Sequence, residues 1–287
     1  MSKAVVLVAL VSFAVVLSQE NHRQWGPPHH LCDLDDADVR ESSGIAPSRM
    51  SDGVYYTHND SGDTARFFRF DRKGHVSGVY LLDGVNAIDC EDIASAIVDG
   101  TPYIYLGDIG DNFEHRKSIA VYRTKEPSQA GDNTLEKFDS YTIKYPDGPH
   151  NCEALFVTQS GDIWLATKEA GGITHVYRLP KPAKSGTYVV QHVADVVTDT
   201  GGLGGKLVTG GDISPDGKHV VLRTYTAAME FDVPSDIQGW VKSTPHFVRL
   251  AVERQGEGIC YSRDGHSLLT TSEFAPCPVT VLSLEGP

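Results

Sequence analysis

The sequence predicts an all-β protein, a five-bladed β-propeller whose last blade is completed by an amino-terminal strand. Five stretches repeat one pattern, in which a small or acidic residue precedes short alternating strands separated by Gly, Asp and Pro turns. Their aligned residues are 45 to 62 positions apart, a spacing typical of propeller blades. A β-sandwich also has many short strands, but it does not explain acids repeated at a fixed phase. The stretches begin at Ser42, Cys90, Cys152, Gly210 and Gly256.

Alternating apolar residues justify the strands of each repeat, and helical periodicity is nearly absent. The first repeat predicts strands at Ser43–Pro47, Val54–His58, Ala65–Asp71 and Ser77–Leu82. The second predicts Asp92–Ile97, Pro102–Asp108, Ser118–Arg123 and Phe138–Tyr145. The third runs through Trp164, Val176–Leu179 and Tyr188–Val193, and the fourth through Val220–Tyr225, Ala228–Val233 and His246–Leu250. The remaining long segments are expected to be surface loops: Lys125–Lys137, Leu179–Tyr188 and Thr198–Leu207.

The fifth repeat has only three strands and ends at Val279–Leu284. An incomplete final blade leaves an open sheet edge, because its outermost strand lacks a neighbour. Full closure of the ring removes such an edge. We therefore expect His30–Leu34, just before the first repeat, to complete the last blade.

The first 18 residues have the composition of a secretory signal peptide, with one cation at Lys3, a long apolar run and small residues near the end. We expect residues 19–287 to form a single domain that is secreted to the extracellular space. A membrane anchor would need about 20 apolar residues and a stop-transfer flank. The net charge of −13 argues against nucleic acid as a partner. A monomer without membrane association is expected.

Five cysteines in an oxidising compartment predict one or two disulfides and one odd thiol. Cys32 and Cys277 lie near the two ends of the chain, so a bridge between them would close the ring. Cys90 and Cys152 occupy the same position in consecutive repeats and form a second candidate pair. Cys260 is expected to be buried and unpaired.

The repeats also predict where a site lies. The innermost strand of a four-stranded blade starts on the face where the second strand ends, so both sets of residues line one mouth. The strand starts supply the predicted metal ligands Ser43, Glu91, Glu153, Asp212 and Glu257. The second-strand ends supply Asp60 and Asp108 as predicted catalytic residues, and His58, Asn112, Lys168, Arg223, Tyr225 and Glu273 as predicted substrate-binding residues.

Carboxylates that converge on a narrow channel repel one another unless a cation lies between them. Calcium fits best, because it accepts six to eight oxygen ligands with loose geometry. Zinc is not favoured, since neither His nor Cys shows the spacing of metal ligands. The alternative is that the acids cap backbone amides or pair with Lys168 and Arg223. Those two cations also suit a phosphate or carboxylate that bridges metal and side chains.

Four segments together resemble a family of secreted and periplasmic β-propeller proteins of largely unassigned function: His58–Asp63, Glu91–Ala94, Gly107–Asn112 and Gly256–Gly258. The likeness runs from about Glu41 to Glu273. More distantly, the axial acids are similar to those of calcium-dependent propeller hydrolases, namely the phytase-like, gluconolactonase-like and calcium-activated nucleotidase groups. The chain departs from the phytase pattern in having far fewer Lys and Arg residues in the mouth.

These observations suggest a calcium-dependent hydrolase of a small anionic ester or lactone. The ion would polarise the scissile group, Asp108 or Asp60 would take a proton from water, and Lys168 and Arg223 would hold the anion. One alternative is a non-catalytic, calcium-stabilised module that binds glycan, extracellular matrix or mineral. Another is a protein-interaction scaffold, which predicts exposed aromatic residues around the rim, where Tyr225 and Phe274 are available. No serine-hydrolase elbow, zinc-protease helix motif or phosphate loop is present.

Overall fold

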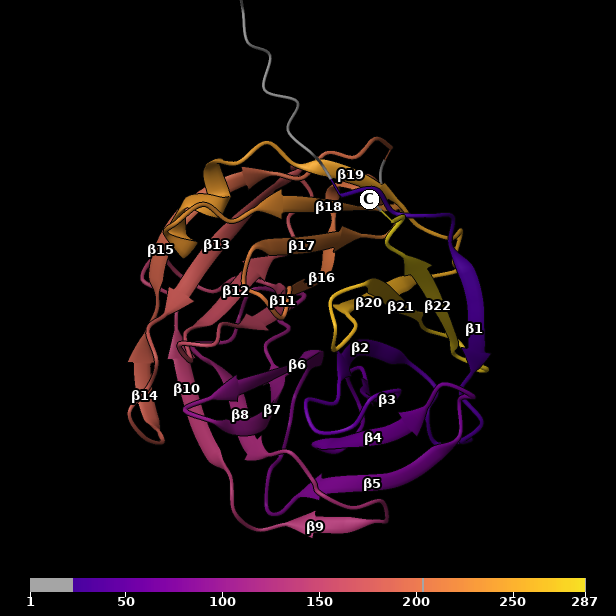
Figure 1. The fold of residues 1–287 in the computed structure, drawn as a ribbon. Helices are drawn as coiled ribbons and strands as arrows, with labels where there is room; N and C mark the ends of the chain where they lie inside the picture. Colours follow the sequence, from indigo (N-terminus) through magenta and orange to yellow (C-terminus); the bar gives the residue numbers. More distant parts are fainter. Residues whose placement is uncertain (1–22, 203, 287) are drawn as a thin grey trace, which may run out of the picture.

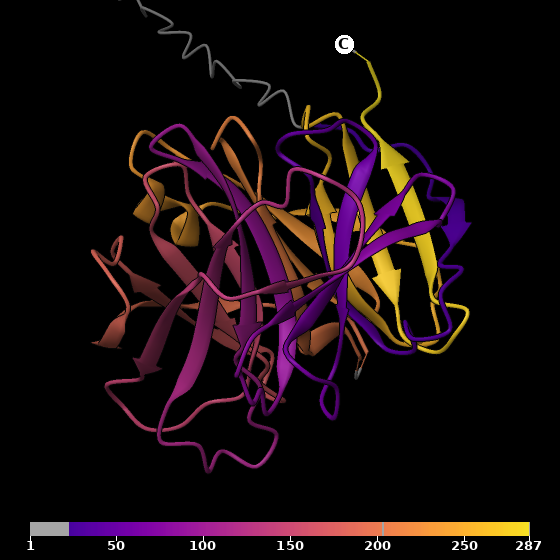
Figure 2. The ribbon, with the colours of Figure 1, turned by 90° about the horizontal axis from the view of Figure 1, so that it is seen from below.

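The computed structural model describes residues 23–202 and 204–286, which form five sheets around a central axis (Figure 1). The all-β, five-bladed propeller is therefore confirmed. Figure 2 shows the strands running between the two faces of the ring. The innermost strands contact one another in chain order around the axis; they are β2 (Ser42–Pro47), β6 (Cys90–Val98), β11 (Cys152–Val157), β16 (Val208–Ile213) and β20 (Gly256–Tyr261).

The first four blades are built outward from these strands by antiparallel neighbours. Blade 1 adds β3 (Val54–Asn59), β4 (Arg66–Asp71) and β5 (Val76–Leu82), and blade 2 adds β7 (Thr101–Asp108), β8 (Ile119–Lys125) and β10 (Asp139–Lys144). Blade 3 adds β12 (Ile163–Thr167), β13 (Ile173–Leu179) and β15 (Gln191–Val197). Blade 4 adds β17 (His219–Thr224), β18 (Ala227–Asp232) and β19 (His246–Arg249).

The last blade joins the two ends of the chain. Strand β20 pairs with β21 (Ser267–Ser272), β21 pairs with β22 (Pro278–Ser283), and β22 pairs with β1 (His29–Asp33), all antiparallel. Figure 1 shows β1 and β22 side by side at the outer edge of the ring. Closure by an amino-terminal strand is thus confirmed, and the strand begins one residue earlier than expected.

Two segments expected to be loops contain strands that reach the preceding blade, so that expectation is wrong for them. Strand β9 (Asn133–Leu135) leaves blade 2 and pairs in parallel with β5, while β14 (Gly186–Val189) leaves blade 3 and pairs in parallel with β10. Each excursion covers an outer edge whose backbone groups would otherwise lack partners. The fourth strand of blade 3 is consequently β15. The third expected loop contains the short 3₁₀ turn η1 (Gly204–Lys206), and another turn, η2 (Ile237–Lys242), precedes β19.

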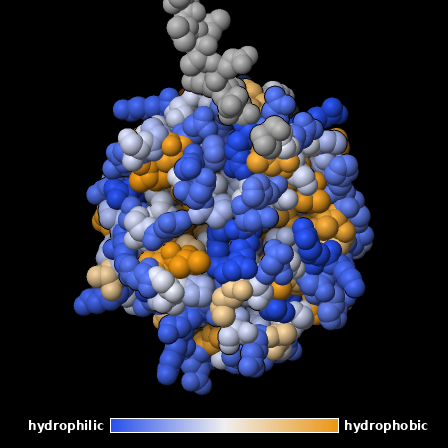
Figure 3. All heavy atoms as spheres, viewed as in Figure 1, coloured by the Kyte–Doolittle hydropathy of each residue, from blue (hydrophilic) through white to orange (hydrophobic). Residues whose placement is uncertain are grey.

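The hydrophobic core lies between the faces of adjacent blades. Between blades 3 and 4, for example, the ring of Phe156 stacks on Trp164 at 5.8 Å and meets Trp240 edge-on at 6.0 Å. Because each blade buries both faces against its neighbours, the innermost strands are fixed relative to one another. The face seen in Figure 3 is mostly hydrophilic, with separate hydrophobic patches.

All five cysteines lie in the described part of the chain as buried free thiols. The predicted disulfides Cys32–Cys277 and Cys90–Cys152 are therefore wrong. Cys90 and Cys152 pack in different interblade cores, because equivalent positions of consecutive blades face different neighbours. Cys32 and Cys277 share one core, where burial raises the pKa of each thiol to about 11. They behave as small apolar residues.

The predicted signal peptide, residues 1–18, lies outside the described residues. Among the described residues, no helix has the length and apolar character needed to cross a membrane.

Candidate metal and substrate site at one mouth of the channel

Each innermost strand is bulged at the same phase, close to its start. The register with the second strand shifts between Ser42 and Gly44, and at the equivalent place in β6, β11, β16 and β20. A bulge adds an unpaired residue and re-aims its side chain, and such bulges are common beside active sites. The bulged residues are Ser43, Glu91, Glu153 and Thr209 in the first four blades, and Glu257 with Gly258 in the fifth.

Two further rings of residues surround the bulges. One lies just past the last paired residue of each second strand and contains Asp60, Ile109, Lys168, Tyr225 and Glu273. The other lies two residues before each bulge and contains Glu41, Asp89, Asn151, Leu207 and Gln255. Backbone hydrogen bonds tie the two rings together in blades 1, 3 and 5, as in Lys168 N to Asn151 O at 2.9 Å. These three sets of mostly polar residues therefore lie at the same end of the ring, although Ile109 is buried in the core between blades 2 and 3.

Three carboxylates converge on one side of this mouth. Ligand oxygens of Asp60, Asp89 and Glu91 lie within 4.8 Å of one another. A Cβ atom on Gly110 would lie only 2.4 Å from carboxylate oxygens of both Asp89 and Glu91, so any other residue there would displace these two carboxylates. Asp89 Oδ1 is buried and has no hydrogen-bond partner. We call this group the acidic trio.

Blade 3, the next blade around the ring, contributes a lysine to the mouth. Lys168 Nζ lies 2.9 Å from Glu153 Oε1 and 5.0 Å from the centre of the Tyr225 ring. Asn151 Nδ2 donates to the same Glu153 oxygen at 3.1 Å. Although burial opposes it, the carboxylates of Glu153 and Glu257 raise the pKa of Lys168, so the side chain stays an ammonium ion. We call this group the lysine side.

The mouth holds more negative charge than Lys168 balances. Burial, together with Asp60 and Glu153, raises the pKa of Asp89 to about 7. Burial and the nearby Glu153 raise the pKa of Glu257 to about 8, and Glu257 Oε2 is buried without a hydrogen-bond partner. Burial and Asp60 likewise raise the pKa of Glu273 to about 7. Burial and mutual repulsion also raise the pKa of Glu91 well above its usual value. Ionisation of these acids is therefore unfavourable in the folded chain, and a bound cation would reduce the repulsion between their carboxylates.

Asp212 does not belong to this mouth, and its place in the predicted ligand set is wrong. The bulged residue of blade 4 is Thr209, whose hydroxyl donates to the carbonyls of Gly256 and Glu257 at 3.0 and 3.1 Å. Asp212 lies three residues further along β16. Its carboxylate accepts from the N–H groups of Ile213 and Tyr261 at 2.8 and 2.9 Å. The repeated acids favoured the wrong alignment, because a hydroxyl occupies the aligned position in blade 4.

Two other predicted site residues, Arg223 and Asp108, are held by hydrogen bonds and ion pairs inside the protein. Arg223 is fully buried, pairs with Glu253, and donates through Nη1 to the carbonyls of Gly258 and Thr271. Asp108 accepts from Asp89 N at 3.0 Å and pairs with Arg116 at 2.8 Å. Arg223 is therefore not available to bind an anion, and Asp108 is not available to accept a proton from water. Asp108 instead positions the backbone of Asp89.

His58 and Asn112 lie at different depths. His58 is fully buried, and its Nδ1 donates to Asn59 O at 2.8 Å, which leaves Nε2 as an acceptor without a partner beside Gly44. Burial lowers the pKa of this imidazole. A substrate cannot reach it directly. Asn112 is exposed at the rim, where its Oδ1 accepts from Asn151 Nδ2 at 3.3 Å.

The residues that the sequence reasoning missed are Asp89, Asn151 and Gln255. Each stands two positions before a bulged residue, and side chains two apart on a strand share a face. Gln255 Nε2 donates to Glu273 Oε2 at 2.7 Å, and Asn151 contacts Glu153 as described. Counting two residues back from each repeated acid identifies these three positions in the sequence.

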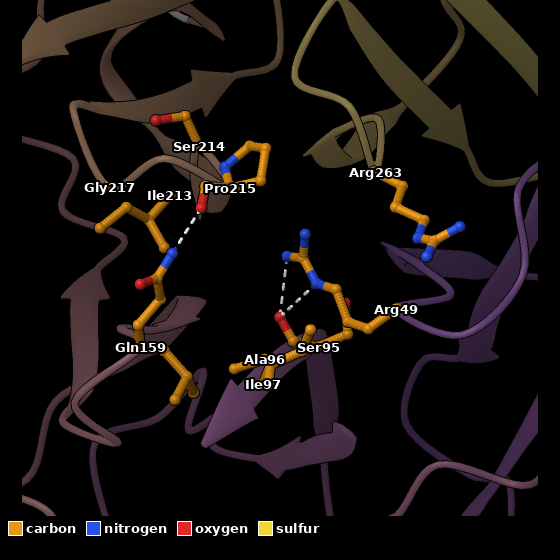
Figure 4. Close-up of a pocket in the computed structure, with 11 residues that line it drawn as sticks. Arg49, Ser95, Ala96, Ile97, Gln159, Ile213, Ser214, Pro215, Gly217 and Arg263 are labelled. Atoms are coloured by element: carbon orange, nitrogen blue, oxygen red, sulfur yellow. Dashed lines mark hydrogen bonds between the residues drawn. The ribbon is translucent and has the colours of Figure 1, made fainter. Parts of the chain in front are cut away.

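Two arginines lie at the other end of the channel. A cavity of about 150 Å³ there is lined by Arg49 and Arg263 among others (Figure 4). Arg49 donates through Nε and Nη2 to Ser95 O at 3.1 and 2.8 Å. Across the cavity, Gln159 Nε2 donates to Pro215 O at 2.6 Å. No sequence motif pointed to this cavity.

No protein-family model matches the chain, and no curated protein sequence matches it. Among solved structures, the chain is similar to the PQQ-bound aldose sugar dehydrogenase of Streptomyces coelicolor, with a TM-score of 0.53 and 10% identity over 92% of this chain and 99% of that one. A gluconolactonase of Xanthomonas campestris gives a TM-score of 0.49 and 12% identity, over 90% and 89% of the two chains. At this level of identity, the first likeness supports the propeller fold alone.

Proposed function

We propose that the mouth binds Ca²⁺ through the acidic trio and hydrolyses a small anionic ester or lactone. The observation that supports the proposal most is the pair of buried carboxylate oxygens without partners, Asp89 Oδ1 and Glu257 Oε2. Buried acids without partners are costly and are rarely retained without a reason. Secretion remains part of the proposal and rests on the composition of residues 1–18.

The residues present fit a hard cation. Asp60, Asp89 and Glu91 offer oxygen ligands only, and Gly110 leaves room for two of the carboxylates to approach the same point. When bound, calcium would polarise the scissile carbonyl and stabilise negative charge that develops on its oxygen. Asp60 is only half-buried, so the trio is open toward solvent on that side.

The lysine side would bind and orient the substrate. Lys168 carries a fixed positive charge beside the Tyr225 ring, which together suit the anionic group of a small ester. Glu257 is the best candidate to accept a proton from water, because its Oε2 has no partner and a cation bound nearby would favour its ionised form. Glu273, held by Gln255, lies close enough to Glu257 for their charges to interact.

A substrate panel of lactones and anionic esters, assayed in calcium and in chelator, tests the proposal. We expect turnover only in calcium. Glu91→Gln should abolish the calcium-dependent rise in melting temperature and the turnover together. Glu257→Gln should keep the rise and lower turnover by about 10²-fold or more. The exposed Asp83→Asn serves as a matched control that changes neither. Calcium-independent turnover, or full activity in Glu257→Gln, would contradict the mechanism.

A second candidate, a carbohydrate-binding module without catalysis, is favoured by two exposed rings on the mouth side. Phe113 is 81% exposed on the loop after β7. Phe274 follows the mouth residue Glu273, is 42% exposed, and has a backbone φ of 71°, which is strained for a bulky residue. Such strain often marks a functional position. Specific glycan binding by a calcium-loaded protein that turns over no ester or lactone, lost in Phe113→Ala and Phe274→Ala, would favour this candidate.

A further inference from the structure

A second group of possible metal ligands lies behind the rim of blade 3. It consists of His150 from the loop before β11, Glu169 from the turn after β12, and His175 from β13. One ligand atom from each lies within 4.8 Å of the others. His150 and Glu169 are the sequence neighbours of Asn151 and Lys168, which face the mouth. The two groups are therefore adjacent along the chain.

Glu169 is the member of this group that indicates a cation site. Its Oε1 atom is buried and has no hydrogen-bond partner. The same atom lies 3.7 Å from His150 Nδ1. Ligands of a tetrahedral zinc ion, at about 2.1 Å from the metal, lie roughly 3.4 Å apart. The observed separation is thus close to that of two ligands of one ion.

Both imidazoles are already oriented by carboxylates, as metal-binding histidines usually are. His150 Nε2 lies 3.2 Å from Asp147 Oδ1 and 2.9 Å from the hydroxyl of Tyr177, which itself donates to Asp147. His175 Nδ1 lies 2.7 Å from Asp195 Oδ1. These contacts leave His150 Nδ1 and His175 Nε2 as the free ring nitrogens.

We propose that His150, Glu169 and His175 bind one Zn²⁺ ion, with Asp147 and Asp195 as orienting residues. Two imidazole nitrogens and one carboxylate suit this borderline ion, whereas calcium prefers oxygen ligands alone. Three protein ligands leave a fourth position for water. The sequence did not favour zinc, because these residues come from three separate elements and show no short-range spacing.

An overlapping group, formed by His175, His192 and Asp195, fits less well. Its side chains are 32%, 38% and 54% exposed, against 17%, 23% and 32% for His150, Glu169 and His175. Asp195 Oδ1 is also shared between His175 and His192, at 2.7 and 2.8 Å. The more shielded group, with its unpartnered oxygen, is therefore assigned as the site.

Titration of the metal-free, tag-free protein with ZnCl₂ by calorimetry tests the assignment, with stoichiometry checked by elemental analysis. We expect one ion per chain. His150→Gln and His175→Gln should each weaken binding by about 100-fold, and Asp195→Asn by about 10- to 100-fold. His192→Gln should leave the affinity within about threefold, because it removes no proposed ligand. X-ray absorption should show two imidazoles in the zinc shell.

Two controls separate this site from others. His75→Gln removes an exposed histidine that also pairs with a single aspartate, Asp35, at 3.0 Å, and should not change zinc binding. Glu91→Gln, which disables the proposed calcium site, should not change it either. The assignment is overturned if zinc does not bind, if zinc binding persists when both His150 and His175 are replaced, or if His192→Gln abolishes zinc binding. Circular dichroism of each variant confirms that the propeller is folded.

Discussion

Asp212 and Glu257 are both buried acids of innermost strands, yet their surroundings and their pKa values differ. Burial raises the pKa of Asp212 to about 6, opposed by Arg49 and by the N–H groups of Tyr261 and Ile213. Burial raises the pKa of Glu257 to about 8, with Glu153 adding repulsion. Asp92 resembles Asp212, since its carboxylate accepts from the N–H groups of Ile93, Leu155 and Gly211.

The difference in hydrogen bonding separates acids that stabilise the fold from acids that are candidates for a functional site. Asp92 and Asp212 link adjacent blades through hydrogen bonds to backbone N–H groups, so both carboxylate oxygens of each are used. At the mouth, one oxygen of Asp89 and one of Glu257 have no partner. Burial alone does not reveal a site. Unmet hydrogen-bonding capacity, together with like charges nearby, is the better indicator.

The largest expected effect is on the structural side of this comparison. Asp92→Ala should lower the free energy of unfolding by about 3 kcal/mol or more, because it leaves buried N–H groups of three innermost strands without an acceptor. Urea denaturation in chelator measures the loss. Glu257→Gln, measured in parallel, should be neutral or stabilising. The comparison fails if Glu257→Gln is the more damaging substitution.

The second effect concerns calcium. Binding to the folded state alone should add about 2.7 kcal/mol at a hundredfold excess of ion over Kd. Glu91→Gln should abolish this increment, whereas Asp212→Asn should retain it while lowering the baseline stability. Thermal unfolding in calcium and in chelator gives both numbers. If Asp212→Asn removes the increment, the assignment of Asp212 to the structural group is wrong.

The third effect is a pH dependence of stability in chelator. The folded pKa values of Asp89, Glu257 and Glu273 are raised, so between about pH 5 and pH 8 the folded state binds more protons than the unfolded state. Stability must then fall as pH rises through this window. One unit of pKa corresponds to about 1.4 kcal/mol, and because solvent screening reduces the contribution of each group we expect a loss of at least about 1–2 kcal/mol.

Chemical denaturation at a series of pH values, with and without calcium, measures this loss. Calcium should reduce it, because the ion favours the ionised carboxylates. Glu257→Gln should reduce the slope of the profile in chelator, since glutamine does not titrate while Asp89 and Glu273 still do. A stability in chelator that rises steadily from pH 5 to pH 8 would show that the mouth acids are not held as the structure indicates.

The sequence predicted the ring and half of the mouth for a clear physical reason. A repeated local pattern predicts the strands, the number of blades and the closure by the amino-terminal strand. It also predicts that Glu91, Glu153 and Glu257 lie close together. The prediction for Asp212 is wrong because shifting the alignment of blade 4 by three residues still places an acid at the repeated position. Only the position of the β-bulge shows that Thr209 is the equivalent residue. Arg223 and Asp108 were misread because their partners Glu253 and Arg116 belong to other elements. The group around His150 was missed because its members meet only in the folded chain.

The smallest expected effect shows whether the hydroxyls of the bulged residues Ser43 and Thr209 stabilise the fold or bind the metal ion. Ser43 Oγ donates to Glu91 O at 3.1 Å, much as Thr209 donates to the carbonyls of the next blade. If both hydroxyls are structural, Ser43→Ala and Thr209→Ala should each lower the free energy of unfolding by about 0.5–1.5 kcal/mol, the usual contribution of one hydrogen bond. Calcium affinity, measured by calorimetry, should be unchanged in both variants. A weaker affinity in Ser43→Ala alone would instead return Ser43 to the ligand set predicted from the sequence, because its hydroxyl would then contact the ion as well as the carbonyl of Glu91.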